Sequence, residues 1–477
     1  MRNLKTLFAQ GAAILIAMLS FSLTGDAAQT GLTYAIKDAK IVTVSGTTIE
    51  KGTILIQGGI ITAVGATVAV PVDAVVTDGT GMTVYPGLID MANTDPVDPG
   101  DTPAPAAGRG GGGRGGGGGQ TFATLEEADR VKRTALLRPD YMASGNLIDG
   151  SEQLTALASA GVTTVLAVPA TGIFKGQSAL VNVAVPPDDP QISAPGTYRK
   201  GLAVVKSPVA QHINIYGRGG GPGFPNSLLG VIAFTRQALL DAQWQRDATA
   251  IYQKIDGRGP RPLVEPALDS LQPAMAKALP VIFDANEGRE IDRSLLMASD
   301  FGLDPIIVGG AEAGDRIAEL QAAKARVLLT INFSDGAAAG GRGGGGGRGG
   351  GGNPSLRQLR QQANAPKVAA MLAQAGVPFA FTSGGSTGAE FVRNAGRTVS
   401  EGGLTAEAAL KALTIDAARI AGADDRLGSI EVGKIANVIV TSGDLFDAAT
   451  RVRHVFIDGV PVELAAPAAA GNGRGGR

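Results

Sequence analysis

The side chains best suited to chemistry in this sequence stand at the ends of short apolar runs. Asp284 ends the run in LPVIFDANEG, Ser383 ends the run in VPFAFTSGG, and Lys175 lies in GIFKGQS. A serine needs a base beside it to act as a nucleophile, and Lys175 is a candidate base for Ser383. The acidic residues Asp284, Glu287 and Glu312 could instead share the acid and base roles of a glycosidase. A simpler interpretation competes with both: these charges line a hydrated rim.

The apolar runs themselves predict the elements that hold these side chains. Runs of this kind are typical of strands buried on both faces of a parallel sheet. They are GVTTVLAVPA, LPVIFDANEG, DPIIVGGAEA, ARVLLTINFSDG and VPFAFTSGG. Helical stretches lie between them, for instance at residues 227–255 and 354–376. Repeated strand–helix units over residues 87–430 favour a (β/α)8 TIM-type barrel, in which the ends of the strands meet at one mouth.

The two ends of the chain follow a different pattern, with short Val-, Ile- and Thr-rich segments that partly alternate. The pairs Gly58-Gly59 and Asp78-Gly79 supply turns in residues 29–86, and Asp458-Gly459 supplies one in residues 431–465. We therefore expect one small β-sandwich domain built from both chain ends, with the barrel between them. The predicted fold class is α/β.

The first residues predict a signal peptide. Arg2 and Lys5 precede an apolar run over residues 7–23, and the small residue Ala27 offers a cleavage point, so residues 1–27 are expected to be removed. No further long apolar run follows, which argues against a membrane span after cleavage. The chain has no cysteine, which excludes disulfides and thiolate metal sites and suits an exported protein. A periplasmic or secreted location follows.

Three tracts rich in glycine and arginine interrupt the pattern, at residues 108–120, 340–352 and 471–477, the last within a tail over residues 466–477. We expect them to be disordered, because they carry no apolar side chains that could offset the entropy of ordering. The tracts at 108–120 and 340–352 follow predicted strand ends and should lie near the barrel mouth. Glycine–arginine tracts can bind RNA, but the net charge of −1 and the scarcity of aromatic residues argue against a nucleic-acid partner.

Several blocks of the sequence resemble the amidohydrolase superfamily, in particular its imidazolonepropionase-like branch, and they stand in family order. They include IEKGTILIQGGIITAVG, GTGMTVYPGLIDM, LPVIFDANEGREIDRSLLMASDFGL and GLTAEAALKALTIDAARIAGADDRLGSIEVGKIANVIV. The resemblance implies a metal-dependent hydrolase of C–N bonds, often in cyclic amides. Such an enzyme would use Zn²⁺ or a similar ion, held by imidazole and carboxylate groups, to ionise bound water. An aspartate after the last barrel strand would move the proton to the leaving nitrogen.

The positions at which this resemblance places the metal site hold other residues. They are, in chain order, Ala92, Thr94, Asp284, Val308, and Ser383 or Gly384. The only two histidines of the chain, His212 near a loop and His454 in a strand of the C-terminal sheet, are expected to be ordinary surface or packing residues. Binding of a hard cation by Asp284 and Asp90 would need about six oxygen ligands, which the neighbouring positions do not supply. We therefore expect no metal cofactor.

Two hypotheses for the function follow. In the first, an exported member of the family has lost its metal site and acts by binding a small molecule at the barrel mouth. It would form a homo-oligomer, or a hetero-oligomer as a scaffold for an active relative. In the second, the chain is an active C–N hydrolase with a divergent site around Asp284. The candidate catalytic residues are Asp284 and Ser383. The candidate binding residues are Asp90, Thr94, Asp284, Glu312 and Ser383.

Overall fold

A computed structural model describes most of the chain. The described residues are 32–99, 124–148, 152–183, 198–199, 202–216, 224–333, 355–462 and 464. The predicted signal peptide at 1–27, the glycine–arginine tracts at 108–120 and 340–352 and the tail at 466–477 lie outside them. Among the described residues, no helix has both the length and the apolar character needed to cross a membrane.

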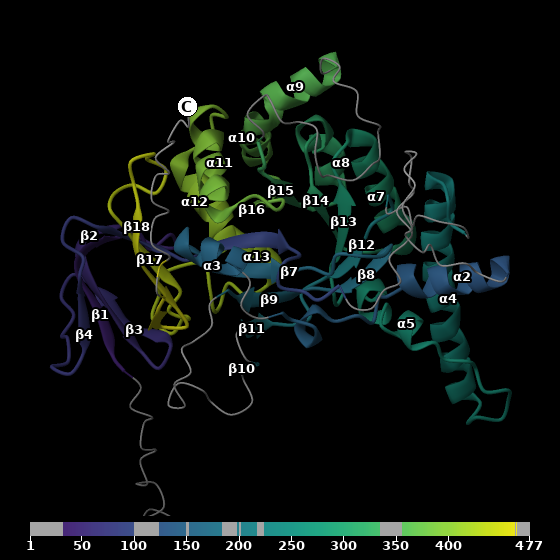
Figure 1. Ribbon diagram of the computed structural model, residues 1–477. Helices are drawn as coiled ribbons and strands as arrows, with labels where there is room; N and C mark the ends of the chain where they lie inside the picture. The colour runs from purple at the N-terminus through teal and green to yellow at the C-terminus, as the bar shows by residue number, and fades with distance from the viewer. Residues whose placement is uncertain are drawn as a thin grey trace, which may run out of the picture.

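Seven parallel strands and one antiparallel segment surround the barrel interior (Figure 1). The parallel strands are β6 (Leu88–Asn93), β7 (Val162–Ala167), β12 (Gln211–Ile213), β13 (Val281–Ala285), β14 (Pro305–Gly309), β15 (Arg326–Thr330) and β16 (Phe379–Thr382). β6 pairs with β7, and β12 to β16 pair in sequence order. β16 lies beside β6, where the Thr382 hydroxyl donates to the carbonyl of Ala92 at 3.0 Å.

The antiparallel segment joins the two sheets of the barrel. It consists of β8 (Phe174–Gln177) and β9 (Ala179–Asn182), which follow each other with only Ser178 between them. β9 runs antiparallel to β7, and β8 runs antiparallel to β12. Two short strands, β10 (Tyr198–Arg199) and β11 (Leu202–Lys206), extend the sheet beyond β9. This segment departs from a barrel made only of parallel strands.

Alternation along the strands separates an inner from an outer apolar layer. The inner cluster draws on six barrel strands, through Ile89 and Met91, Leu166, Ile282, Ile306, Leu328 and Ala380. Their neighbours Phe283, Ile307 and Leu329 belong to an outer cluster that packs under the helices. Burial on both faces explains why these strands are almost continuously apolar in sequence.

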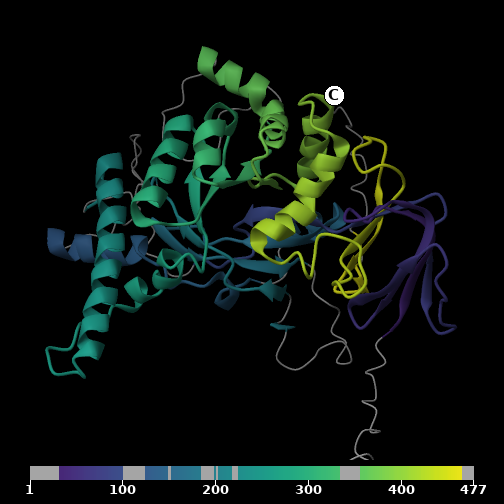
Figure 2. The same ribbon diagram turned by 180° about the vertical axis from the view of Figure 1, so that it is seen from behind.

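The helices cover the outside of the strands, and those of residues 288–421 gather on one side in Figure 2. They are α2 (Leu125–Leu136), α3 (Glu152–Ser159), α4 (Leu228–Lys254), α5 (Pro266–Asp269), α6 (Gln272–Met275), α7 (Gly288–Phe301), α8 (Ile317–Ala322), α9 (Leu356–Asn364), α10 (Val368–Gln374), α11 (Gly388–Ser400), α12 (Ala406–Leu413) and α13 (Ile415–Ala421). The helix predicted over 227–255 forms as α4. The stretch at 354–376 instead breaks into α9 and α10 at a 3-10 turn that contains Pro366, which lacks an amide hydrogen for the helix.

The two chain ends meet in one eight-stranded sheet, seen as purple and yellow ribbons side by side in both views. Its strands are β1 (Tyr34–Ile41), β2 (Ile49–Gln57), β3 (Ile60–Gly65), β4 (Val75–Asp78), β5 (Thr83–Pro86), β17 (Val438–Thr441), β18 (Val452–Ile457) and β19 (Val460–Pro461). β17 pairs antiparallel with β5 and so joins the C-terminal strands to the N-terminal ones. The predicted fold class, a barrel plus a small β-domain from both ends, is confirmed.

Candidate functional site in the barrel mouth

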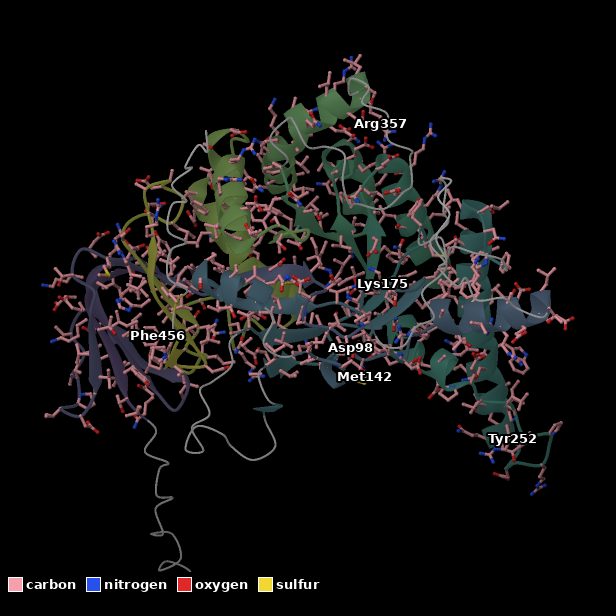
Figure 3. All side chains as sticks on the ribbon, viewed as in Figure 1. Asp98, Met142, Lys175, Tyr252, Arg357 and Phe456 are labelled. Carbon is pink, nitrogen blue, oxygen red and sulfur yellow. The ribbon has the colours of Figure 1, made fainter. Side chains whose placement is uncertain are left out.

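An ion pair between Lys175 and Asp284 joins two strands of the barrel. The Nζ of Lys175 on β8 lies 2.6 Å from Oδ2 of Asp284 on β13, and Figure 3 shows Lys175 among the barrel strands. The two side chains are 10% and 27% exposed, so the pair is largely shielded from water. The other carboxylate oxygen, Oδ1, is buried and has no hydrogen-bond partner among the described residues. In Asp284, Oδ2 is thus paired with Lys175, and Oδ1 is an acceptor without a donor among the described residues.

The next three strands carry aliphatic side chains in register with Asp284. Asp284 stands in register with Val308, Val308 with Leu328, and Leu328 with Ala380. Residues in register on neighbouring strands point to the same face of the sheet, so the carboxylate shares its layer with three apolar side chains. Val308 packs against the inner cluster and offers no donor atom.

His212 lies deeper in the barrel than the sequence indicates. It is on β12, in register with Ile282 of the inner cluster, and is completely buried. His212 is therefore a packing residue, one of the two alternatives expected from the sequence, and it lies within a strand rather than beside a loop. Burial, and secondarily the charge of Lys175, lowers the pKa of His212 well below its usual value. Its ring is thus neutral at pH 7, and neither ring nitrogen has a partner among the described residues.

On the opposite part of the barrel, Asp90 anchors a second polar cluster. Its carboxylate on β6 is completely buried and accepts hydrogen bonds from the Ser383 amide at 2.9 Å, the Ser383 hydroxyl at 2.7 Å and the Asn93 side chain at 3.2 Å. Burial raises the pKa of Asp90 above its ordinary value, while the hydrogen bonds oppose that shift. The Ser383 hydroxyl donates to Asp90, and Lys175 donates to Asp284. The structure therefore supplies no contact for the serine–lysine pair considered from the sequence.

Local backbone geometry accounts for two other predicted site positions. The pairing of β6 with β7 shifts register between Asp90 and Asn93, and Thr94 beyond the strand is exposed. Gly384 adopts a left-handed φ of 58°, and an added Cβ would lie 2.4 Å from Cγ2 of Thr330. A larger side chain at Gly384 would strain the backbone and displace the Thr330 side chain.

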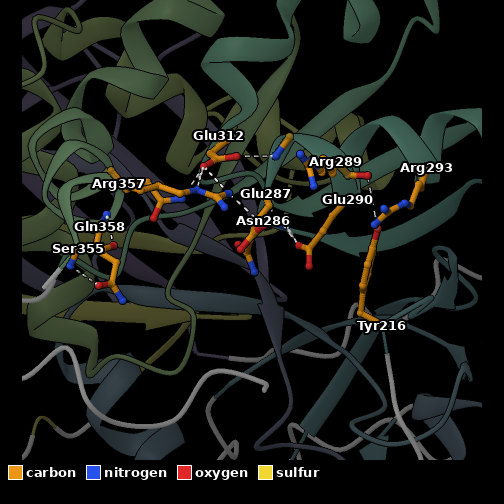
Figure 4. Close-up of polar contacts among 12 residues, drawn as sticks. Tyr216, Asn286, Glu287, Arg289, Glu290, Arg293, Glu312, Ser355, Arg357 and Gln358 are labelled. Carbon is orange, nitrogen blue, oxygen red and sulfur yellow. Dashed lines mark hydrogen bonds and ion pairs between the residues drawn. The ribbon is translucent and has the colours of Figure 1, made fainter. Parts of the chain in front are cut away.

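Glu312 lies on the rim, in a network drawn in Figure 4. It accepts from the Gly288 amide at 2.7 Å, at the start of α7, and pairs with Arg357 at 2.9 Å. Arg357 also pairs with Glu287 at 3.0 Å. Burial opposes the charge of Glu312, but its hydrogen bonds outweigh that effect and hold its pKa below the usual value. The acidic residues Glu287 and Glu312 thus share Arg357, which links α9 to α7, and neither contacts Asp284.

The donor atoms at these positions do not fit the metal that the family resemblance implies. Zinc-class ions need three or four nitrogen, sulfur or oxygen ligands around one point. Among the described residues, no group of three or more His, Asp or Glu side chains comes together in a way that could hold a metal ion. Asp284 has Lys175 beside it, and a lysine ammonium repels a cation at the same oxygen.

The comparisons with known proteins agree on the fold. The amidohydrolase family model matches residues 355–462. An amidohydrolase structure from Thermotoga maritima MSB8 is similar over 91% of this chain and all of its own, with 22% sequence identity and a TM-score of 0.68. A prolidase in complex with N-methylphosphonate-L-proline and a putative prolidase from Bifidobacterium longum each show 18% identity over 91% of this chain, with TM-scores of 0.50. They are covered over 100% and 95% of their own lengths, respectively.

No curated protein sequence matches the chain. At such low identities the solved structures establish the fold, while the family model identifies the sequence pattern of α9 to β19. That segment contains the α12–α13 helices and the sheet strand β17, where the resemblance in the sequence is also most specific. Residues 355–462 thus carry the sequence pattern of the amidohydrolase family, and the chain as a whole has the fold of these solved structures.

Proposed function

We propose that this protein acts by binding a small molecule at the barrel mouth rather than by metal-dependent hydrolysis. The ion pair between Lys175 and Asp284 carries the proposal, because a charge of the chain itself neutralises the one carboxylate left at a family ligand position. The aliphatic layer of Val308, Leu328 and Ala380 supports it, since such side chains bind apolar groups and not cations.

The Lys175 ammonium and the Asp284 carboxylate define the chemistry of the ligand. The Lys175 ammonium has three N–H donors, and one of them donates to Asp284. The ammonium can therefore also donate to an anionic group of a ligand. The free Oδ1 of Asp284 would accept from an N–H or O–H of the same ligand. A small zwitterion or amide-containing acid meets both demands.

The first experiment combines metal analysis with ligand screening. We expect purified protein to contain far less than one zinc, manganese or iron per chain, and its melting temperature to rise with small zwitterions. The variant Lys175→Met should abolish that rise, while Lys37→Met, at an exposed lysine of the end sheet, should keep it. Stoichiometric metal, or an unchanged ligand response in Lys175→Met, would overturn the proposal.

A second candidate function is C–N hydrolysis by a divergent site around Asp284. The free Oδ1 favours it, because an unpartnered carboxylate oxygen can accept a proton from water. The test is a screen of cyclic imides, hydantoins and dipeptides, with and without chelator. Turnover that survives in Asp284→Ala would exclude this role.

The location of the protein is part of the same proposal. The basic and apolar residues of 1–27, together with the absence of cysteine from the sequence, support export to the periplasm or beyond. Fractionation of cells that make the tagged full chain should recover a shortened product outside the cytoplasm. Recovery of the uncut chain in the cytoplasm would contradict export.

A further inference from the structure

Helix α4 has apolar side chains on two opposite faces. Its buried face packs on the protein through Phe234, Ala238 and Ala242. The other face carries a second set, which we call the α4 stripe: Leu240 (48% exposed), Trp244 (64%), Ile251 (61%) and Ile255 at the helix end (42%). At 100° per residue the four stripe directions fall within about 60° of one another, on the side away from the buried set.

Such a helix is unusual for a surface element, which normally presents charged and polar residues to water. The four large apolar side chains form two pairs spaced by four residues on one side of the helix, with Asp247 and Ala248 between the pairs. Exposed apolar side chains gathered on one surface mark interaction sites. Figure 3 shows Tyr252 near the tip of α4, far from the rest of the molecule, so this half of the helix projects as an arm. A partner can therefore reach the stripe without touching the barrel.

The spacing of the stripe identifies the kind of partner. Its members are separated by four, seven and four residues, so the pattern is the same in both chain directions about a midpoint between Asp247 and Ala248. In a two-fold symmetric contact, residue i meets residue j of the other copy and j meets i. Two antiparallel α4 arms would place Leu240 against Ile255 and Trp244 against Ile251, each twice.

We propose that the α4 stripe binds the stripe of a second copy of this chain, as an antiparallel helix pair across a two-fold axis. Opposed helix dipoles favour this direction. The charged residue closest to the axis, Asp247, is paired with Arg246 of its own chain at 3.0 Å, which reduces repulsion between the two copies of Asp247. The proposal is independent of the function proposed for the barrel mouth.

The size of the arm predicts a weak dimer. Sixteen residues of helix are about 24 Å long and about 10 Å wide, which offers a few hundred Å² per copy. Stable interfaces bury about 800 Å² per partner. The dimer should therefore be weak and dissociate on dilution.

Trp244 is the only tryptophan of the chain and lies within the stripe, so it reports on the contact directly. Sedimentation of the purified protein over a concentration series should show a monomer–dimer equilibrium, and tryptophan emission should shift to shorter wavelength as the dimer forms. Ile251→Glu should remove both effects. Leu356→Glu is the matched control, at a helical leucine with 64% exposure on α9, and should leave both unchanged.

A charge exchange tests the register. Trp244→Lys alone and Ile251→Glu alone should both be monomeric, whereas the double variant brings each lysine against a glutamate and should regain dimer at low salt. Trp244→Lys with Ile255→Glu, which places no glutamate opposite the lysine, should stay monomeric. Circular dichroism checks that each variant folds.

A wild-type protein that remains monomeric at about 100 μM, or a dimer that persists in Ile251→Glu, would overturn the proposal. The same holds if the monomer binds lipid vesicles through Trp244, since the stripe would then serve a membrane surface.

Discussion

Two polar clusters lie in the same barrel and are built in opposite ways. The Asp90 cluster on β6 and β16 satisfies its carboxylate with three donors from Ser383 and Asn93. The Lys175 cluster on β8, β12 and β13 leaves one oxygen of Asp284 and both nitrogens of His212 without partners among the described residues. Buried polar groups are normally hydrogen-bonded, and those that are not call for a functional explanation. The comparison suggests that the first cluster holds the barrel together and the second is kept for a ligand.

Removal of Asp90 tests the first half of this contrast and should have the largest effect. Asp90→Ala leaves the Ser383 amide, the Ser383 hydroxyl and the Asn93 amide without an acceptor in a buried place. At about 1–3 kcal/mol for each unsatisfied buried group, with partial relaxation, we expect a loss of about 3 kcal/mol or more in the free energy of unfolding. Urea denaturation measures it.

The exposed neighbour Asp95 provides the control. Asp95→Ala removes a carboxylate from the same loop but leaves no buried donor without an acceptor. A loss below about 1 kcal/mol in Asp90→Ala would show that the cluster does not stabilise the barrel.

The next largest effect is expected when an aspartate, which the sequence resemblance places at Ser383 or Gly384, is introduced at Ser383. Ser383→Asp brings a second carboxylate beside Asp90 in a completely buried place and removes the hydroxyl donor. Like charges in one site disfavour double ionisation, so we expect about 2 kcal/mol of destabilisation at pH 7, less at pH 5. Ser383→Ala removes the hydroxyl donor without adding a charge, so the stability difference between the two variants measures the effect of the added charge. Equal stability of the Asp and Ala variants at both pH values would contradict this reasoning.

The sequence predicts the fold well because the fold depends on regular patterns. The apolar runs of β13 to β16 and the alternation near the chain ends follow from burial on two faces and on one face, respectively. The antiparallel segment β8–β9 was not anticipated, since its strands are four residues each and are separated by one buried serine. Its direction depends on pairing with β7 and β12, which no local pattern contains.

The site was predictable at the level of residue types but not of partners. Asp284 and Lys175 stand out as charges at the ends of apolar runs, yet their contact spans 109 positions of the chain. His212 was expected near a loop, as a surface or packing residue, because its strand has only three residues and two of them are polar, and its burial could not be read from this pattern. Ser383 and Asp90 also lie far apart in sequence, and only the closure of β16 against β6 brings them together.

Replacement of His212 should give a smaller effect of the opposite sign. His212→Leu exchanges a buried ring with two unpartnered nitrogens for an apolar side chain that suits the inner cluster, so we expect a gain of about 1 kcal/mol in unfolding free energy at pH 7. The gain should grow as the pH falls below 6.5. The unfolded chain then protonates its histidine, while the buried ring, with its lowered pKa, does not.

Exposed His454 of the end sheet serves as the control, and His454→Leu should change neither the stability nor its pH dependence appreciably. A loss of stability in His212→Leu would mean that the ring nitrogens have partners that the unligated barrel requires.

The smallest effect concerns the pH dependence contributed by Asp90. Its folded pKa lies above the ordinary 3.8 because burial penalises the charged form. Its contribution is therefore fully present below the unfolded pKa and is lost as the pH rises through the folded value, the reverse of the His212 effect. Asp90→Asn keeps an acceptor but cannot ionise, so the stability difference between wild type and this variant should fall from pH 4 upward and then level off. If the difference instead grows with pH, the hydrogen bonds from Ser383 and Asn93 outweigh burial, and the satisfied cluster holds its charge at every pH of the titration.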